Sequence, residues 1–328
     1  MRALVYDSFG PPETLRLEDV PQPRPAPGEV LVRVHAASLN SWDWDLMLGS
    51  TMGRIGSPFR PPRKILGADI AGTVEAVGDG VAGFAPGDAV FGDLSEGNWG
   101  GLAELVCARI SALAPVPAGL GWVDAAALPQ AGALALQALR RRPELGAADR
   151  VLINGAGGGV GTFAVQMVKA LGAHVTAVDR AEKRDALLAL GADAFIDYRQ
   201  TDFAAGEARY DLIVDVVANR SVRAFARVLG DGGNLVVIGG TIGTLLQVAA
   251  FGALVGRKRR QRLELLIYRA SPKDNAELAR RCLSGSLRPI IDAVYPLEQG
   301  ATALRRLGDG HAIGKVVVAP TGLTANAY

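Results

Sequence analysis

A glycine-rich turn near the middle of the chain restricts the possible fold more than any other segment. It reads Arg150-Val-Leu-Ile-Asn-Gly-Ala-Gly-Gly-Gly-Val-Gly161. The apolar residues at its start predict a buried strand, and residues 162–171 predict a helix that ends before Gly172. A strand, a glycine turn and a helix in this order are typical of a dinucleotide-binding fingerprint. Glycines let the backbone approach a pyrophosphate, and the N-terminus of the helix offers unpaired N–H groups.

The fingerprint departs from the usual pattern at one position. Ala156 stands where the first of three spaced glycines is expected, and Gly158 and Gly161 follow at the expected positions. Gly159 and Val160 complete the predicted phosphate-binding turn. A glycine turn that binds no ligand is the alternative interpretation, but the flanking strand and helix patterns disfavour it.

The residues after the next predicted strand bear on the type of dinucleotide. Asp179 ends that strand about 20 residues after the turn, where an acid that binds the adenosine ribose and favours NAD is expected. Arg180, Lys183 and Arg184 follow at once, and these cations could pair with the 2′-phosphate of NADP. A helix-capping acid and solvated cations are the simpler interpretations. The sequence therefore leaves NAD(H) and NADP(H) open.

Alternating strand and helix patterns occupy residues 123–287. Strands are expected at 151–154, 174–178, 194–197, 211–216 and 235–238, with a possible sixth at 263–268. This alternation predicts an α/β fold with a Rossmann doubly wound parallel sheet. Helices are expected at 123–142, interrupted at Pro129, and at 275–283. Residues 241–256 are small and apolar without a clear period, and we interpret the longer region 241–271 as part of a pocket wall or a dimer contact.

The rest of the chain has a different character. Residues 1–122 contain short alternating strands separated by Pro and Gly, and residues 288–328 contain strand patterns at 290–294 and 315–319. We therefore predict a β-rich domain made of residues 1–122 plus 288–328, and a dinucleotide-binding domain made of residues 123–287.

Composition excludes several classes of protein. The net charge of +2 argues against a nucleic-acid binder, and we interpret the basic run at 257–262 as a solvated face. The two cysteines and three histidines lack the spacing of a zinc site. The chain has no apolar run of about 20 residues and no apolar signal core at its start. We therefore expect no membrane segment and a cytoplasmic location.

Short motifs along nearly the whole chain resemble zinc-free members of the medium-chain dehydrogenase/reductase superfamily, of the quinone oxidoreductase type. The motifs lie at residues 40–43, 67–72, 84–92, 100–104, 126–132, 154–161, 191–198, 210–216 and 314–318. The resemblance implies that the β-rich domain is a GroES-like barrel. It also implies hydride transfer from NAD(P)H to a small-molecule substrate, a quinone or an α,β-unsaturated carbonyl, and a homodimer. Zinc-dependent relatives carry a Cys ligand and a Gly-His-Glu segment where this chain has Asn40 and Gly67-Ala-Asp69, so no zinc is expected.

The resemblance also assigns roles to individual residues. Asn40 is expected to contact the nicotinamide or the substrate, although a turn Asn that binds its own backbone is an alternative. Asp43 is interpreted as a helix cap. The residues implied to line the dinucleotide groove are Gly132, Gly158, Gly159, Val160, Arg184, Tyr198, Val217 and Gly239.

One cofactor-pocket position departs from the family pattern. Leu134 stands where the family commonly has a Thr that touches the nicotinamide, so a hydroxyl is missing there. This departure leaves open the alternative that the protein is a dinucleotide-binding sensor or a crystallin-like protein without catalysis. An enoyl-thioester or carbonyl reductase of a biosynthetic pathway is the alternative among enzymes.

Overall fold

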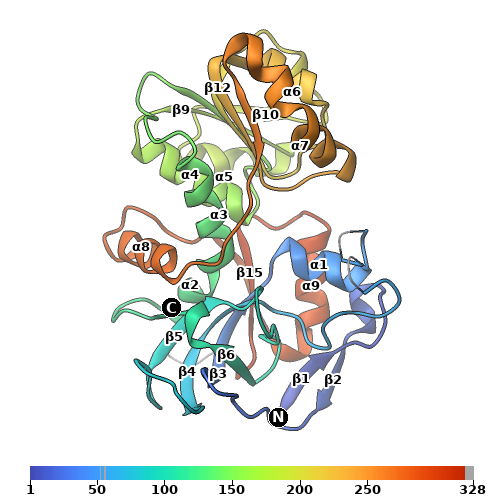
Figure 1. Cartoon of the computed structure of the whole chain (residues 1–328), viewed down its shortest axis with the longest axis vertical. Helices are drawn as coiled ribbons and strands as arrows, with labels where there is room; N and C mark the ends of the chain where they lie inside the picture. Colours follow the sequence, from blue (N-terminus) through green and yellow to red (C-terminus); the bar gives the residue numbers. More distant parts are fainter. Residues whose placement is uncertain (52, 55–56, 322–328) are drawn as a thin grey trace. The chain divides into compact units, whose positions relative to one another are not determined.

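The computed structural model describes residues 1–51, 53–54 and 57–321 (Figure 1). The chain divides into two compact units. The first comprises Met1–Ala133 and the C-terminal segment from Ala270, and the second comprises Leu134–Arg269. The predicted boundaries at 122 and 288 therefore both fall inside the first unit. The reason is packing: α2 (Trp122–Ala127) lies against β3 (Glu29–Ser38) and β4 (Asp69–Val77), and α8 (Pro272–Leu283) lies against β7 (Leu113–Pro115).

The second unit is built on a parallel sheet with the order β10-β9-β8-β11-β12-β13. Its strands are β8 (Arg150–Asn154), β9 (His174–Asp179), β10 (Ala194–Asp197), β11 (Tyr210–Asp215), β12 (Leu229–Val237) and β13 (Arg262–Leu265). The order reverses between β8 and β11, as in a Rossmann fold, and ligands of such sheets bind beyond the carboxyl ends at this point. The predicted doubly wound parallel sheet is confirmed, and the sixth strand is shorter than predicted.

Helices accompany this sheet: α4 (Gly159–Ala170), α5 (Arg184–Ala189), α6 (Val222–Val228) and α7 (Ile242–Gly256). α4 begins within the glycine turn, three residues earlier than the sequence pattern predicted. α7 was not predicted as a helix, because it is apolar on nearly every side and gives no amphipathic period. The hydroxyl oxygen of Thr241 caps it by accepting a hydrogen bond from the Thr244 N–H at 3.3 Å.

The first unit contains the β-rich sheet, in the order β14-β15-β3-β4-β5-β7, with β6 also paired to β3. These strands are β3 (Glu29–Ser38), β4 (Asp69–Val77), β5 (Ala89–Asp93), β6 (Leu105–Arg109), β7 (Leu113–Pro115), β14 (Ile291–Pro296) and β15 (Lys315–Ala319). β1 (Arg2–Val5) and β2 (Arg16–Asp19) form a separate antiparallel pair. The prediction that the C-terminal strands fold onto the N-terminal ones is confirmed, since β15 pairs with β3.

Helices α1 (Ser41–Leu48) and α9 (Gly300–Gly308) also belong to the first unit, and α3 (Pro129–Leu139) crosses the boundary between the units. The core of the first unit is aliphatic, with Val32, Ile70 and Val316 fully buried. β15 is buried along its whole length, including Lys315 at its start. A buried lysine at the edge of an apolar core requires acceptors, and these determine the site described below.

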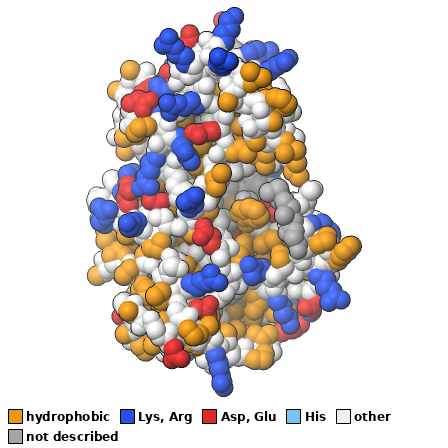
Figure 2. All heavy atoms as spheres, in the orientation of Figure 1, with side chains coloured by type: hydrophobic (Ala, Val, Ile, Leu, Met, Phe, Trp, Pro, Cys, Tyr) orange, Lys and Arg blue, Asp and Glu red, His pale blue; other side chains and the backbone are white. Residues whose placement is uncertain are grey.

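The surface charges and the lengths of the helices bear on two classes that the composition disfavours, a nucleic-acid binder and a membrane protein. On the face drawn in Figure 2, acidic side chains lie among the Lys and Arg side chains. Arg257, Lys258, Arg259 and Arg260 of the basic run are all exposed, as a solvated face requires. None of the helices formed by the described residues is long and apolar enough to cross a membrane.

Candidate functional site

The glycine turn of the second unit is held against the neighbouring strand. The N–H groups of Gly155 and Ala156 both donate to the carbonyl oxygen of Val178, at 3.0 and 3.2 Å. A Cβ atom on Gly161 would lie 2.3 Å from the Gly155 carbonyl oxygen, so the helix starts too close to the turn for any side chain there. The side chain of Ala156 is fully buried, so the structure accommodates the departure from the usual fingerprint.

The opposite side of the turn is open. Gly158 is the N-cap residue of α4, and no side chain caps this helix. A Cβ on Gly158 would meet only the Gly155 carbonyl oxygen, at 3.5 Å. Gly158, Gly159 and Val160 are all partly exposed. The uncapped N–H groups of α4 and the space over Gly158 therefore fit an anionic group such as a pyrophosphate.

Asp179 lies beside the same turn but faces inward. One carboxylate oxygen accepts a hydrogen bond from the Gly157 N–H at 2.7 Å, and the other accepts one from the Arg180 N–H at 2.8 Å. The ammonium group of Lys183 lies 3.7 Å from the same carboxylate, and both side chains are more than nine-tenths buried. In this arrangement Asp179 fixes the turn, and Lys183 neutralises its charge.

The remaining cations and aromatic side chains near the turn are more exposed. The hydroxyl oxygen of Tyr198, at the end of β10, accepts a hydrogen bond from Nε of Arg180 at 3.2 Å. Tyr198 is 42% exposed, and Arg184 at the start of α5 is exposed as well. Arg180, Arg184 and Tyr198 thus offer polar groups at the carboxyl end of the sheet.

The other predicted cofactor residues fall in two places. Val217 and Gly239 follow the carboxyl ends of β11 and β12, where the Ala218 N–H donates to the Gly239 carbonyl oxygen at 2.9 Å. Gly132 and Leu134 lie on α3. A Cβ on Gly132 would lie 2.8 Å from Leu278, so packing against α8 alone explains this glycine. The structure brings together the predicted residues at the carboxyl ends of the strands; the roles of Gly132 and Leu134 stay predictions.

A buried polar pair at the carboxyl ends of β8 and β11 was missed by the sequence reasoning. The Asn154 side-chain amide donates to Oδ1 of Asp215 at 2.9 Å, and the Val217 N–H donates to the same oxygen at 3.0 Å. Oδ2 of Asp215 is buried without a hydrogen-bond partner. Burial raises the pKa of this carboxyl to about 7. The pair fixes the end of β11 just before Val217.

Asn40, the predicted catalytic residue, lies in the first unit between β3 and α1. Its main-chain N–H donates to Asp43 at 2.8 Å, and the other oxygen of Asp43 accepts the Gly67 N–H at 2.8 Å. The Asp43 side chain is fully buried. The interpretation of Asp43 as a helix cap is confirmed, and this cap also joins the segment of Asn40 to the segment that precedes Asp69.

The side chain of Asn40 is held from two sides. Its Nδ2 donates to Asp69 at 2.9 Å, and its Oδ1 accepts a hydrogen bond from Nζ of Lys315. Lys315 Nζ also donates to the Leu39 carbonyl oxygen at 3.0 Å and lies 3.6 Å from Asp69. The side chain of Asn40 thus bonds to two residues distant in sequence, and it also accepts the backbone N–H of Asp43 in a reciprocal capping box, so the local interpretation accounts for only part of its contacts. Sequence reasoning assigned no role to Lys315, although a charged residue before three valines was a usable signal.

The cluster around Asn40 carries several buried charges. Asp69 lies opposite Asp93 in the β4–β5 pairing, and each is 1% exposed or less. Burial raises the pKa of Asp69 and lowers that of Lys315, and the attraction between the two charges opposes both shifts. Burial also raises the pKa of Asp43 to about 6. Lys315 is the cation that offsets these carboxylates.

This cluster does not have the ligands of a zinc site. Zinc in proteins prefers Cys sulfur and His nitrogen, with carboxylates in addition. Here Asn40 and Asp69 are accompanied by the ammonium group of Lys315, which repels a second cation. Among the described residues, no group of three His, Cys, Asp or Glu side chains is arranged to hold a metal ion.

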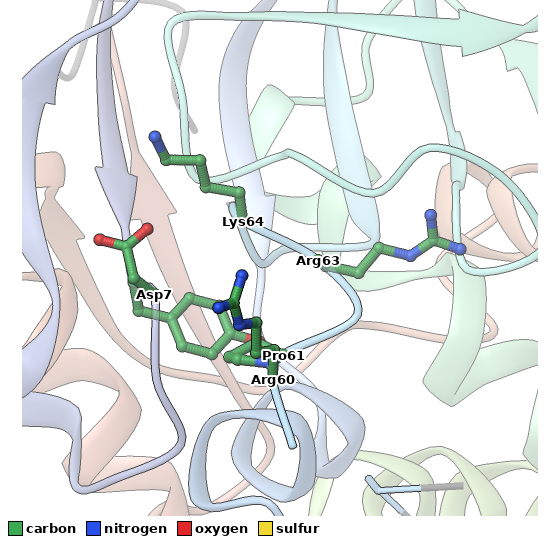
Figure 3. A pocket seen from close by; sticks show the side chains of 6 residues that line it. Asp7, Arg60, Pro61, Arg63 and Lys64 are labelled. Atoms are coloured by element: carbon green, nitrogen blue, oxygen red, sulfur yellow. The ribbon is translucent and has the colours of Figure 1, made fainter. Parts of the chain in front are cut away.

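A surface cavity of about 450 Å³ in the first unit is lined by Tyr6, Asp7, Arg60, Pro61, Arg63 and Lys64. Figure 3 shows that the side chains of Arg63 and Lys64 extend in different directions. Asp7 is paired with Arg16 at 2.5 Å. Because its cations do not converge, the cavity offers no defined anion site.

The chain is similar to known proteins along nearly its whole length. Residues 26–118 match the model of the alcohol dehydrogenase GroES-like domain, and residues 190–318 match that of the zinc-binding dehydrogenase domain. The chloroplast envelope quinone oxidoreductase homolog of Arabidopsis thaliana is 34% identical, over 98% of both chains. A trans-enoyl reductase of Aspergillus terreus is 33% identical, over 89% of this chain and 86% of its own. The structure of the quinone oxidoreductase from Coxiella burnetii superposes with a TM-score of 0.87, at 31% identity, over 98% of this chain and 99% of that one.

Proposed function

The chain belongs to the quinone oxidoreductase family of medium-chain dehydrogenases/reductases, and from this premise we propose that it is an NAD(P)H-dependent reductase of quinones or α,β-unsaturated carbonyls. The observation that carries the proposal is the uncapped N-terminus of α4 beside the open side of Gly158, at the switch point of the parallel sheet. When bound there, the reduced nicotinamide cofactor supplies a hydride.

The protein's own task in this reaction is to position the acceptor and to stabilise negative charge on its oxygen. An enone or quinone is already electrophilic, so a hydrogen-bond donor at the oxygen suffices to favour the transition state. Asn40 is the donor that we assign to this role, because it is nearly buried and its amide is fixed on both sides. Zinc takes no part in this proposal, since Lys315 lies next to Asn40 and Asp69.

NADPH is the cofactor that the described contacts favour. Asp179, the residue expected to bind the ribose of NAD, uses its carboxylate on the N–H groups of Gly157 and Arg180, and Lys183 offsets its charge. It therefore repels a 2′-phosphate less than a free carboxylate would. The exposed Arg184 and Tyr198 supply a cation and a hydroxyl for that phosphate.

A homodimer is the assembly that we propose. β13 is an edge strand of the parallel sheet, and edge strands readily pair with another chain. The neighbouring α7 exposes large apolar side chains: Leu246 is 64% exposed, Phe251 53% and Leu254 69%. A second copy of this chain would cover both features at once.

A reductase of enoyl thioesters is the second candidate, and the match to a trans-enoyl reductase favours it. Both candidates use the same site chemistry and differ in the acceptor. The test is to mix the pure protein with NADPH or NADH and follow cofactor absorbance with quinones, enals, enones and enoyl thioesters. Turnover of quinones or enones supports the proposal, and turnover of thioesters alone supports the second candidate. Tight cofactor binding without turnover of any acceptor would indicate a non-catalytic dinucleotide-binding protein.

A further inference from the structure

The amide of Asn40 can adopt only one orientation in its surroundings. Its Oδ1 faces Nζ of Lys315, which is a donor, and its Nδ2 faces a carboxylate oxygen of Asp69, which is an acceptor. Rotating the amide by 180° would place Nδ2 against the ammonium group and Oδ1 against the carboxylate. Both contacts would then be repulsive, so the orientation follows from the chemistry of the neighbours.

The two neighbours are themselves held in place. Lys315 lies at the start of β15 and donates also to the Leu39 carbonyl oxygen at 3.0 Å. Asp69 lies at the start of β4 and accepts the Gln130 N–H, which is 3.3 Å from both carboxylate oxygens. Lys315 is 2% exposed and Asp69 is fully buried. Neither side chain can therefore turn toward water and release the amide.

One hydrogen of the Asn40 amide is left over. Nδ2 carries two hydrogens, and Asp69 accepts one of them. Within the part of the chain that the structure describes, no acceptor takes the other. Oδ1 meanwhile accepts from Lys315 and, in the capping box at the start of α1, from the Asp43 N–H, so both of its lone pairs are used. The polar group that Asn40 can offer to a small molecule is thus an N–H, and never a carbonyl oxygen.

We propose that Lys315 and Asp69 are positioning residues that make Asn40 a dedicated hydrogen-bond donor, so that the site favours an oxygen that gains negative charge. The inference rests on the proposed function and adds to it which atom of Asn40 meets the acceptor and what holds that atom there. A preorganised donor of this kind needs no rearrangement when charge develops on the acceptor oxygen.

The test compares variants in the full-length protein with cyclohex-2-enone as acceptor. Asn40→Leu removes the donor and should lower kcat by about 100-fold or more, the loss typical of one oxyanion donor. Lys315→Met removes the group that orients the amide, together with the charge that offsets Asp69 and Asp43, but leaves the amide itself in place, and it should lower kcat at least tenfold. The affinity for NADPH should stay unchanged in both. Lys315→Gln keeps an N–H donor and should recover part of the kcat lost in Lys315→Met.

A matched control separates positioning from general damage. Lys169→Met removes another lysine, one that pairs with Asp193 at 2.9 Å in the second unit, and it should keep the wild-type kcat. A folded Lys315→Met variant with kcat within twofold of wild type would overturn the inference. If the wild-type protein turns over no quinone or enone, it is the proposed function that fails.

A second measurement does not depend on folding of the Lys315 variants. The measurement is NMR of wild-type protein that carries ¹⁵N-labelled asparagine. The signal of the Asn40 side-chain amide is identified as the one that is missing from the spectrum of Asn40→Leu. One of its two protons should shift when cyclohex-2-enone binds in the presence of NADP⁺, and the other, bonded to Asp69, should stay in place. Saturation with the enone without a shift of either proton would refute the role of Asn40 as donor.

Discussion

The two glycines at the start of α4 should respond differently to the same change. In Gly161→Ala the new Cβ would lie 2.3 Å from the Gly155 carbonyl oxygen and 2.5 Å from Cα of Ala156, all of it backbone. The turn must therefore move, at a cost of about 1–3 kcal/mol in the free energy of unfolding. In Gly158→Ala the nearest atom is 3.5 Å away, and φ −82° with ψ 179° suits any residue. The cost there should stay below about 1 kcal/mol.

Dinucleotide binding should nevertheless be weakened in both variants. The methyl group of Gly158→Ala would extend into the open space over the α4 N-terminus, which we assign to the pyrophosphate. We expect NADPH to bind at least tenfold more weakly, measured by calorimetric titration, with a melting temperature near that of wild type. Gly161→Ala should lower both affinity and melting temperature. Wild-type affinity in Gly158→Ala would show that the phosphates bind elsewhere and would refute the assignment of the turn.

Three further changes test the cofactor preference, a buried acid and the assembly. Arg184→Ala should weaken NADPH binding about fivefold or more and leave NADH binding unchanged in parallel titrations, because only NADPH carries the 2′-phosphate. Burial raises the pKa of Asp215 to about 7, so the folded protein keeps a proton there that the unfolded chain loses near pH 4. The free energy of unfolding should therefore fall as the pH rises from about 4 to about 7, by up to about 4 kcal/mol. Asp215→Asn should flatten that fall in chemical unfolding at pH 4 to 8, and an unchanged slope would contradict the burial argument. Light scattering should give twice the 34.2 kDa chain mass for wild type and a single chain mass for Leu254→Glu.

The elements that the sequence predicted well are those whose pattern is local. The apolar run from Val151 to Ile153 forms a buried strand, and the predicted 315–319 strand coincides with β15. α7 was missed because an apolar surface helix has no amphipathic period. A partner that covers this helix, as in the proposed dimer, would explain its exposed apolar side chains.

The parts of the site that could not be predicted depend on contacts between distant residues. Lys315 bonds to Asn40 across 275 positions of sequence, and no local pattern indicates that pairing. Asp179 shows the same limit. Its position at the end of β9 predicts a ribose ligand, and the structure adds that its carboxylate accepts the Gly157 N–H and so supports the turn. Motif spacing predicts which segments contribute to the site, but it does not reveal which of their atoms already form hydrogen bonds within the protein.

Direct hydride transfer is the central claim, and isotope transfer tests it most directly. NADPH deuterated at one face of C4, and in a second sample at the other, is incubated with cyclohex-2-enone and the protein in ordinary water. We predict that one of the two labelled cofactors places its deuterium on the β-carbon of the product, while the α-carbon takes its proton from solvent. Product that carries deuterium from neither cofactor, or no product at all, would contradict the account.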